Sequence, residues 1–448
     1  MNNEVNRRRF IEQAAAIGGG TVGLGRLWAA GPMANEPEPL QPIGQALGIH
    51  PGRVVWVHDP QVIDWQGPGD GHWYQDGRTK QDRVDAMMGQ AVCNLTGAHT
   101  VAQAWDELCR HVNQCRGKGD VGYRTDERIA IKPNWVGMIW REGAADGETY
   151  TLVKRQDYMN TTPQVILALV RQLTEYAGVA EDRIVICDTL AYLVHEYYDI
   201  LHQAFPRVNY EDYAGKFGRT QVKTSSVPLY WSCRPQDVTT DYLPVCFAEA
   251  DYLVNIATLK AHGATGVTLC GKNHFGSLIR WPVETGYYNM HHNSFSKATQ
   301  VYREQVDLMG HAHLGGKTAI HLIDGLFSGT HPIDQAPRRW TSPPFQGNWT
   351  SSLLASQDPV AIDSVGFDFL RAEWDDHPRR SGVDDYLHEA ALAHNPPSGT
   401  FYDPDHPTPV KRLGSLGVHE HWSSPEEKKY SRNLGTGQGI ELIAVESG

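Results

Sequence analysis

Short apolar runs of strand length alternate with longer amphipathic segments along most of this chain. The strand-like runs are residues 53–59, 127–137, 182–191, 251–260, 318–329 and 440–445. Helical spacing marks 99–115, 161–178 and 192–206, while 351–374 has the pattern of a strand, a turn and a helix. Strands that alternate with helices are typical of parallel strands joined by crossover helices. We therefore predict an α/β protein with a mostly parallel sheet and helices on both faces.

Two of the predicted helices begin with clear capping sequences. A threonine pair precedes a proline in 161–178, and Asp358 precedes a proline in 351–374. A side-chain oxygen before a proline in the first turn is typical of a helix N-terminus. We expect Asp358 and Asp363 to cap the helix that starts there and to brace the neighbouring site.

Two segments, 279–316 and 330–350, interrupt this regular pattern. The first is rich in His, Asn and Tyr, and the second is rich in Pro and Trp. Long irregular loops in compact domains often carry function. Trp281, Trp340 and Trp349 could stack on sugar rings, but we favour a packing role for them.

Polar residues directly follow four of the apolar runs. They are Lys132 and Asn134, then Asp188, then Lys260 and His262, and finally Asp324. In open parallel sheets, ligands bind at the carboxyl ends of the strands. One polar residue after a strand is commonplace, but the same arrangement at four strands predicts a shared ligand cleft.

The glycine-rich stretch 258–278 concentrates the chemistry. It places Lys260, His262, Lys272 and His274 among four glycines, which let a ligand approach the main chain closely. Its lysines favour an anion such as a carboxylate or a phosphate.

A helix that begins near Thr265 or Thr268 would add free N–H groups, which also favour an anion. One alternative is a glycine-rich packing turn. Another is Cys270 as a nucleophile whose pKa the flanking cations lower.

Several stretches of this sequence occur in the order and rough spacing of the DUF362 family. They are "IKPNWV", "NTTPQVILAL", "ICDT", "NIATLKAHGATGVTLCGKNHFG", "LIDGL" and "SQDPVAIDSVG". The chain resembles this family over residues 127–370. The family is largely uncharacterised, and some of its members carry added iron–sulfur modules. The resemblance therefore implies a fold and does not supply a reaction.

Histidine is abundant, with 21 copies, and it is the commonest metal ligand in proteins. The candidate ligands are His291, His292, His311 and His313. An extended H-x-H pair, as at His311 and His313, can present both rings to one ion. Asp307 or Asp324 would complete the shell. We predict a divalent transition metal (Fe, Zn, Mn or Ni); the alternative is a solvated histidine-rich loop.

The seven cysteines form no C-x-x-C motif, so we expect no iron–sulfur cluster. Cys187, Cys246 and Cys270 lie in apolar surroundings and are expected to be buried thiols. The net charge of −12, with no long basic run, argues against nucleic acid as a partner.

The first 34 residues have the features of an export signal. Arg7 and Arg8 are followed by a variable, an aromatic and an aliphatic residue, and then by a segment rich in Ala and Gly. This order resembles a twin-arginine signal, which implies the export machinery as a partner and a periplasmic or extracellular location. The alternative is a plain amphipathic helix. No segment predicts a stable membrane span.

We divide the chain into the signal segment (1–34), a linker (35–47) and a single large α/β domain (48–448). We expect an exported enzyme that acts on a small anionic molecule, such as a carboxylate or a sugar acid. The predicted substrate-binding residues are Lys132, Asn134, Asp188, Lys272 and Asp324. The predicted catalytic residues are His262, His274 and Lys260. Lys132 and Lys260 would hold the anion, while His262 or His274 would move a proton, in lyase or isomerase chemistry that a metal assists. The alternative is a periplasmic binding or accessory protein that uses the same cleft without catalysis.

Overall fold

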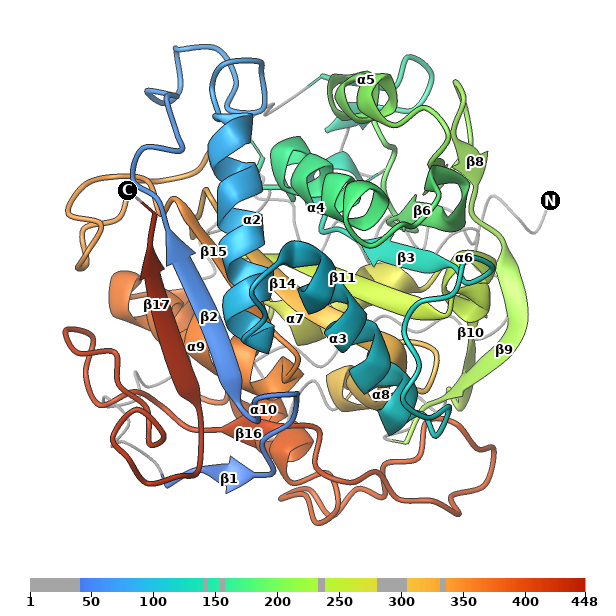
Figure 1. The fold of residues 1–448 in the computed structure, drawn as a ribbon, viewed down its shortest axis with the longest axis vertical. Helices are drawn as coiled ribbons and strands as arrows, with labels where there is room; N and C mark the ends of the chain where they lie inside the picture. Colours follow the sequence, from blue (N-terminus) through green and yellow to red (C-terminus); the bar gives the residue numbers. More distant parts are fainter. Residues whose placement is uncertain are drawn as a thin grey trace, which may run out of the picture. The chain divides into compact units, whose positions relative to one another are not determined.

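The structure, a computed structural model, describes residues 41–139, 144–153, 158–232, 238–279, 304–330 and 336–447. Within them, nine strands form one sheet in the order β17-β2-β15-β14-β11-β3-β6-β7-β8 (Figure 1). Their bounds are β17 Glu441–Glu446, β2 Arg53–His58, β15 Ser352–Ser356, β14 Thr318–Gly325, β11 Tyr252–Thr258, β3 Ile129–Lys132, β6 Ile184–Cys187, β7 Asn209–Asp212 and β8 Thr220–Gln221. In this sheet only β15 runs antiparallel to its neighbours, so the prediction of an α/β protein with a mostly parallel sheet is confirmed.

Helices cover both faces of the sheet (Figure 1). One face carries α2 Gln81–Thr96, α3 Val101–Cys115, α4 Pro163–Glu175 and α5 His195–Ala204. The other carries α6 Val245–Glu249, α7 Cys270–Asn273, α8 Glu304–Gly310, α9 Pro359–Glu373 and α10 Asp385–Ala391. In β2, Val55 and Val57 pack with the first group, whereas Val54 and Trp56 pack with the second. Burial on both faces explains why the strands read as continuous apolar runs.

The predicted side-chain caps are present at the start of α4 and α9, but the prediction for Asp363 is wrong. Thr162 Oγ1 accepts from Val165 N at 3.3 Å at the start of α4, and Asp358 Oδ1 accepts from Ala361 N at 2.8 Å at the start of α9. Asp363 lies inside α9 and does not cap it, which corrects that expectation. Among the described residues, none of the helices has the length and apolar character needed to cross a membrane.

Helix α2 is absent from the sequence-based prediction. Its N-cap position, Lys80, offers no side-chain acceptor, and Gly89 lowers the helix propensity of its middle. Its buried side, which includes Val84, Met88 and Val92, packs against β2 and β15. Tertiary packing therefore stabilises this helix more than its own sequence does.

The tryptophan-rich segment packs into the interior of the domain. Trp340 and Trp349 are both buried, and the Trp349 ring stacks on Trp65 with 5.1 Å between ring centroids. This confirms the packing role for these two residues. Trp281 lies outside the described residues.

Candidate functional site

Four of the predicted site residues follow strands that end at the same edge of the sheet. β3, β6, β11 and β14 are parallel, and Lys132, Asp188, Lys260 and Asp324 lie at or just beyond their carboxyl ends. All four residues are buried, with no more than 4% of their surface exposed. Their polar groups must therefore find partners within the protein.

Lys132 forms a buried ion pair with Asp188. Its ammonium donates to Asp188 Oδ2 at 3.0 Å, to Pro133 O at 2.5 Å and to Asn273 Oδ1 at 3.3 Å. These bonds use all three of its donors. A Cβ at Gly276 would lie 2.9 Å from Lys132 Nζ, so the glycine is needed for the close approach of the main chain to the pair.

Asn273 joins this ion pair to Lys260. Its Oδ1 also accepts from Asn134 Nδ2 at 2.9 Å, and Asn134 Oδ1 accepts from Lys260 Nζ at 2.7 Å. Sequence reasoning did not single out Asn273, although it closes the G-K-N triplet of the glycine-rich stretch. We call this connected set the lysine network: Lys132, Asn134, Asp188, Lys260 and Asn273.

Lys260 lies at one end of the lysine network, and its amine is fully buried. Burial, followed by the positive charge of Lys272, lowers the pKa of Lys260 well below its ordinary value. Its Nζ donates to Asn134 Oδ1 and to the main-chain oxygen of Met159, and no further hydrogen-bond partner for it lies among the described residues. A neutral amine has two N–H groups and one lone pair. In its neutral form, Lys260 would use both donors in these two bonds and keep its lone pair as a base.

Asp324 connects the end of β14 to the start of α4. Its Oδ2 accepts from Thr162 N at 2.7 Å, and its Oδ1 accepts from Leu326 N at 3.0 Å. Burial raises the pKa of Asp324 to about 6, although these amides and Lys260 act in the opposite direction. Asp324 therefore places a titratable carboxyl group beside the lysine network.

The glycine-rich stretch folds into a hairpin followed by a short helix. β12 Lys260–His262 pairs with β13 Gly266–Thr268, and α7 comes next. The expectation of a helix that starts near Thr268 agrees with α7, which begins at Cys270 after the N-cap residue Leu269, whereas Thr265 lies in the turn of the hairpin. The amides of Cys270 and Gly271, which open α7, donate to the Asp363 carboxylate at 2.7 and 2.9 Å. A protein carboxylate thus occupies the start of this helix, and Asp363 braces the site from α9.

His262 lies on the same side of the hairpin as Lys260, because alternate strand residues share a face. Its Nδ1 accepts from Ala264 N at 3.0 Å and from Thr265 N at 3.2 Å. A neutral ring that accepts at Nδ1 carries its proton on Nε2. In the neutral ring of His262, the proton therefore lies on Nε2.

His274 and Cys270 lie behind the network. His274 Nε2 lies 3.2 Å from Asn255 Nδ2, its Nδ1 lies 3.4 Å from Ser277 Oγ, and burial lowers its pKa well below the ordinary value. Burial, followed by the charge of Asp363, raises the pKa of the Cys270 thiol well above its ordinary value. The interpretation of Cys270 as a nucleophile with a lowered pKa is therefore wrong, whereas its burial is as predicted.

Polar groups around the hairpin retain hydrogen-bonding capacity. The hydroxyl oxygens of Thr258, Thr268 and Ser328 are buried and have no hydrogen-bond partner in the part of the chain that the structure describes. Thr268 is the cross-strand neighbour of Lys260. Buried hydroxyls are normally bonded, so these atoms indicate capacity for a ligand or a water molecule.

The family model described as a domain of unknown function (DUF362) matches residues 129–368, which is more than half of the chain. The chain belongs to the DUF362 family. No curated protein matches it. The lysine network, the hairpin and Asp324 all lie within the matched residues, so they are features of the DUF362 domain of this chain.

The predicted metal pair of this DUF362 chain lies at the other edge of the sheet. His311 and His313 precede the amino end of β14, whereas Asp324 lies near its carboxyl end. Six residues of strand separate Thr318, the first residue of β14, from Asp324, which corresponds to about 20 Å. His311 Nε2 lies 3.0 Å from Pro228 O, and His313 Nδ1 lies 2.9 Å from Ala248 O. The pair therefore cannot share an ion with Asp324.

Another group of potential metal ligands lies in the DUF362 domain. One ligand atom from each of Cys187, Glu211 and Cys246 lies within 4.8 Å of the others, and burial raises the pKa of both thiols. Both cysteines are buried, as predicted. The remaining predicted ligands, His291 and His292, lie outside the described residues.

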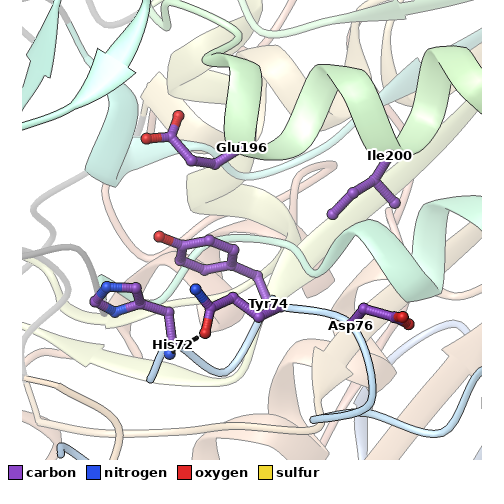
Figure 2. Close-up of a pocket in the computed structure, with 6 residues that line it drawn as sticks. His72, Tyr74, Asp76, Glu196 and Ile200 are labelled. Atoms are coloured by element: carbon purple, nitrogen blue, oxygen red, sulfur yellow. Dashed lines mark hydrogen bonds between the residues drawn. The ribbon is translucent and has the colours of Figure 1, made fainter.

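A pocket of about 380 Å³ opens at the carboxyl edge of the DUF362 sheet, between the loop after β2 and helix α5 (Figure 2). Its lining residues are His72, Tyr74, Gln75, Asp76, Glu196 and Ile200. Figure 2 shows Glu196 and Ile200 on α5 facing the loop residues. Two carboxyl groups line this pocket, so it suits an anion poorly, and no member of the lysine network lines it.

Proposed function

We propose that this DUF362 chain is an enzyme that removes a proton from the carbon next to the carboxylate of a small anionic substrate. The observation that supports it is the amine of Lys260, which is buried, has a lowered pKa and has both donors bound. Lysines of this kind act as general bases. The proton would pass from the substrate carbon to Lys260 Nζ. The charges of Asp324 and Asp188 would then stabilise the ammonium group.

The proposed substrate is a carboxylic or sugar acid, in a lyase or isomerase reaction. Lys272 favours an anionic substrate, because its positive charge is close enough to Lys260 to lower the pKa of that amine. In an elimination, the leaving group would take up the proton that Lys260 has gained. In an isomerisation, a proton would return to carbon.

The remaining predicted residues take positioning roles in this proposal. Lys132, Asp188 and Asn134 bind one another or Asn273, and His274 supports Asn255 from behind. A divalent transition metal that polarises the substrate stays a separate proposal. The predicted His311 and His313 ligands lie across the sheet, so no step above passes through an ion.

A binding or accessory protein without catalysis is the second candidate. The observation that favours it is that Lys132, which is fully buried and uses all its donors within the protein, offers no reactive group. Such a protein would bind the same acids and leave their carbon–hydrogen bonds intact.

The test follows solvent-deuterium exchange at the carbon next to the carboxylate. NMR would monitor small carboxylic and sugar acids that raise the unfolding temperature of the protein. The wild type is expected to exchange this hydrogen, and Lys260→Met is expected to slow the exchange by about 100-fold or more while binding persists. Lys80→Met, which removes a surface partner of Asp64, is the matched control and should behave as wild type.

Two results would contradict this proposal. Binding without exchange in the wild type would favour the second candidate. Undiminished exchange by Lys260→Met would show that another group is the base.

We also propose that the twin-arginine route exports the chain to the periplasm or the extracellular space. The support is the sequence from Arg7 to Ile11, which lies outside the described residues. Because the pathway reads the arginine pair, Arg7→Lys combined with Arg8→Lys is expected to retain the protein in the cytoplasm. Cell fractionation measures this, and continued export of the double variant would reject the proposal.

A further inference from the structure

A group of histidines with one carboxylate lies outside the residues that the family model matches. We call Asp384, His388, His419 and His421 the histidine cluster. Asp384 and His388 belong to the start and middle of α10, and His419 ends β16 Val418–His419. β16 and α10 contact each other and lie together at the lower side of Figure 1. None of the four residues belongs to the lysine network.

The ligand atoms of the cluster converge. One atom from each of Asp384, His388 and His419 lies within 4.8 Å of the others, and His421 Nε2 lies 3.6 Å from Asp384 Oδ2. Bonds of about 2.0–2.2 Å to zinc place ligand atoms about 3.4 Å apart around a tetrahedral ion. Inward shifts of about 1 Å would therefore let these side chains share one ion.

The His419 ring is held so that one nitrogen faces the cluster without a partner. Ser364 Oγ donates to Val360 O at 2.7 Å, so it must accept from His419 Nδ1, 2.9 Å away. His419 Nε2 then carries a lone pair, and this buried atom has no hydrogen-bond partner among the described residues. An unpaired buried nitrogen costs stability, so this atom is suited to bind a metal ion or a water molecule.

The His421 ring is oriented in a similar way from the same helix. Asp368 Oδ2 accepts from Trp422 N at 3.0 Å and from the Tyr430 hydroxyl at 2.9 Å, and Asp368 Oδ1 lies 2.6 Å from His421 Nδ1. The carboxylate therefore accepts the Nδ1 proton and turns Nε2 towards Asp384. Ser364 and Asp368 lie one turn apart on α9. Carboxylates and hydroxyls that fix a histidine in this way are typical partners of metal ligands.

The side chain of Asp384 does not cap the helix at whose start it lies. It is the N-cap residue of α10, where an aspartate normally accepts from the first amides, yet its side chain makes no capping bond. Its carboxylate faces the imidazoles, and 24% of its side chain remains exposed. An ion could therefore enter from solvent on this side.

We propose that the histidine cluster binds one divalent transition metal ion of the zinc class. Imidazole nitrogens with one carboxylate oxygen are a donor set that zinc accepts. The ion would link α10 to the segment after β16, with α9 orienting two of the rings. Its role would be to stabilise this part of the fold.

The test uses the full-length protein after chelator treatment, titrated with Zn²⁺ by calorimetry. The wild type is expected to bind one ion at this site, with a rise in unfolding temperature, and Co²⁺ should give the absorption spectrum of a tetrahedral site. His388→Gln and His419→Gln are each expected to weaken Zn²⁺ binding by about 10-fold or more. His394→Gln, an exposed histidine just beyond α10, should bind as wild type.

If His419→Gln does not fold, Asp384→Asn and His388→Gln carry the test, because both side chains are partly exposed. Unchanged affinity in these two variants would overturn the proposal. So would binding that persists in them and disappears in a His311→Gln/His313→Gln double variant, since the ion would then lie at the other pair.

Discussion

Replacing Asp188 with alanine is expected to lower the free energy of unfolding by about 3–5 kcal/mol. The Lys132 ammonium is fully buried, and Asp188 is its carboxylate partner at 3.0 Å. The substitution leaves this charge among neutral acceptors. It also removes the acceptor of the Trp135 and Leu190 amides. Chemical denaturation at neutral pH measures the loss.

A surface ion pair provides the matched control. Asp199 is 65% exposed and pairs with His195, so Asp199→Ala should change the free energy of unfolding by less than about 1 kcal/mol. Adding Lys132→Met to Asp188→Ala should recover part of the loss, because no unpaired charge then remains. A loss below about 1 kcal/mol for Asp188→Ala alone would show that the pair is not needed for stability.

Between pH 4 and pH 6, the free energy of unfolding of the wild type is expected to fall by about 2 kcal/mol relative to Asp324→Asn. Burial raises the pKa of Asp324 from its ordinary value of 3.8 to about 6. In this interval the folded protein keeps the proton and the unfolded chain loses it, so rising pH favours unfolding. The contribution of the protonated carboxyl is complete below about pH 4 and is lost as the pH rises through about 6.

Denaturation curves at several pH values test this expectation. Asp375→Asn, at a carboxylate that is 91% exposed, should follow the wild type at each pH. Parallel pH profiles for the wild type and Asp324→Asn would contradict the prediction. They would mean that the amides of Thr162 and Leu326 keep the carboxylate ionised throughout.

Much of the fold could be predicted because the sheet is buried on both faces. Such strands appear as continuous apolar runs, and α4 and α9 carry side-chain caps in their sequences. Because a strand that is buried on both faces is apolar throughout in either direction, the residues of β15 do not indicate that it is antiparallel. Helix α2 lacks a cap and depends on packing against β2 and β15, which the sequence alone does not express.

The sequence predicts the charged residues of the site, but it does not predict the residues to which they are hydrogen-bonded. Lys132, Lys260 and Asp324 stand out because charge directly follows apolar strands. The link through Asn273, and the main-chain oxygen of Met159 that helps to fix the Lys260 amine, depend on how α7 and the loop before α4 approach the strands. Amide side chains and main-chain oxygens leave no comparable pattern.

Two H-x-H pairs show why a metal prediction needs three dimensions. His311 with His313, and His419 with His421, are equivalent in sequence. The first pair meets main-chain carbonyls and one carboxylate, Asp405, which lies 3.5 Å from His311 Nε2. The second pair lies beside two further potential ligands, Asp384 and His388. Only tertiary structure distinguishes them.

The pairing of β17 with β2 has a consequence for how the protein folds. Arg53 and Glu441 form an ion pair at 2.8 Å across these strands, although 388 residues separate them. Synthesis proceeds from the N-terminus, so β2 cannot pair with β17 until nearly the whole domain has emerged from the ribosome. Contacts between such distant residues slow folding, and an unpaired apolar edge invites pairing with other chains. Closure of this edge is therefore a late folding step, and aggregation competes with it until β17 arrives.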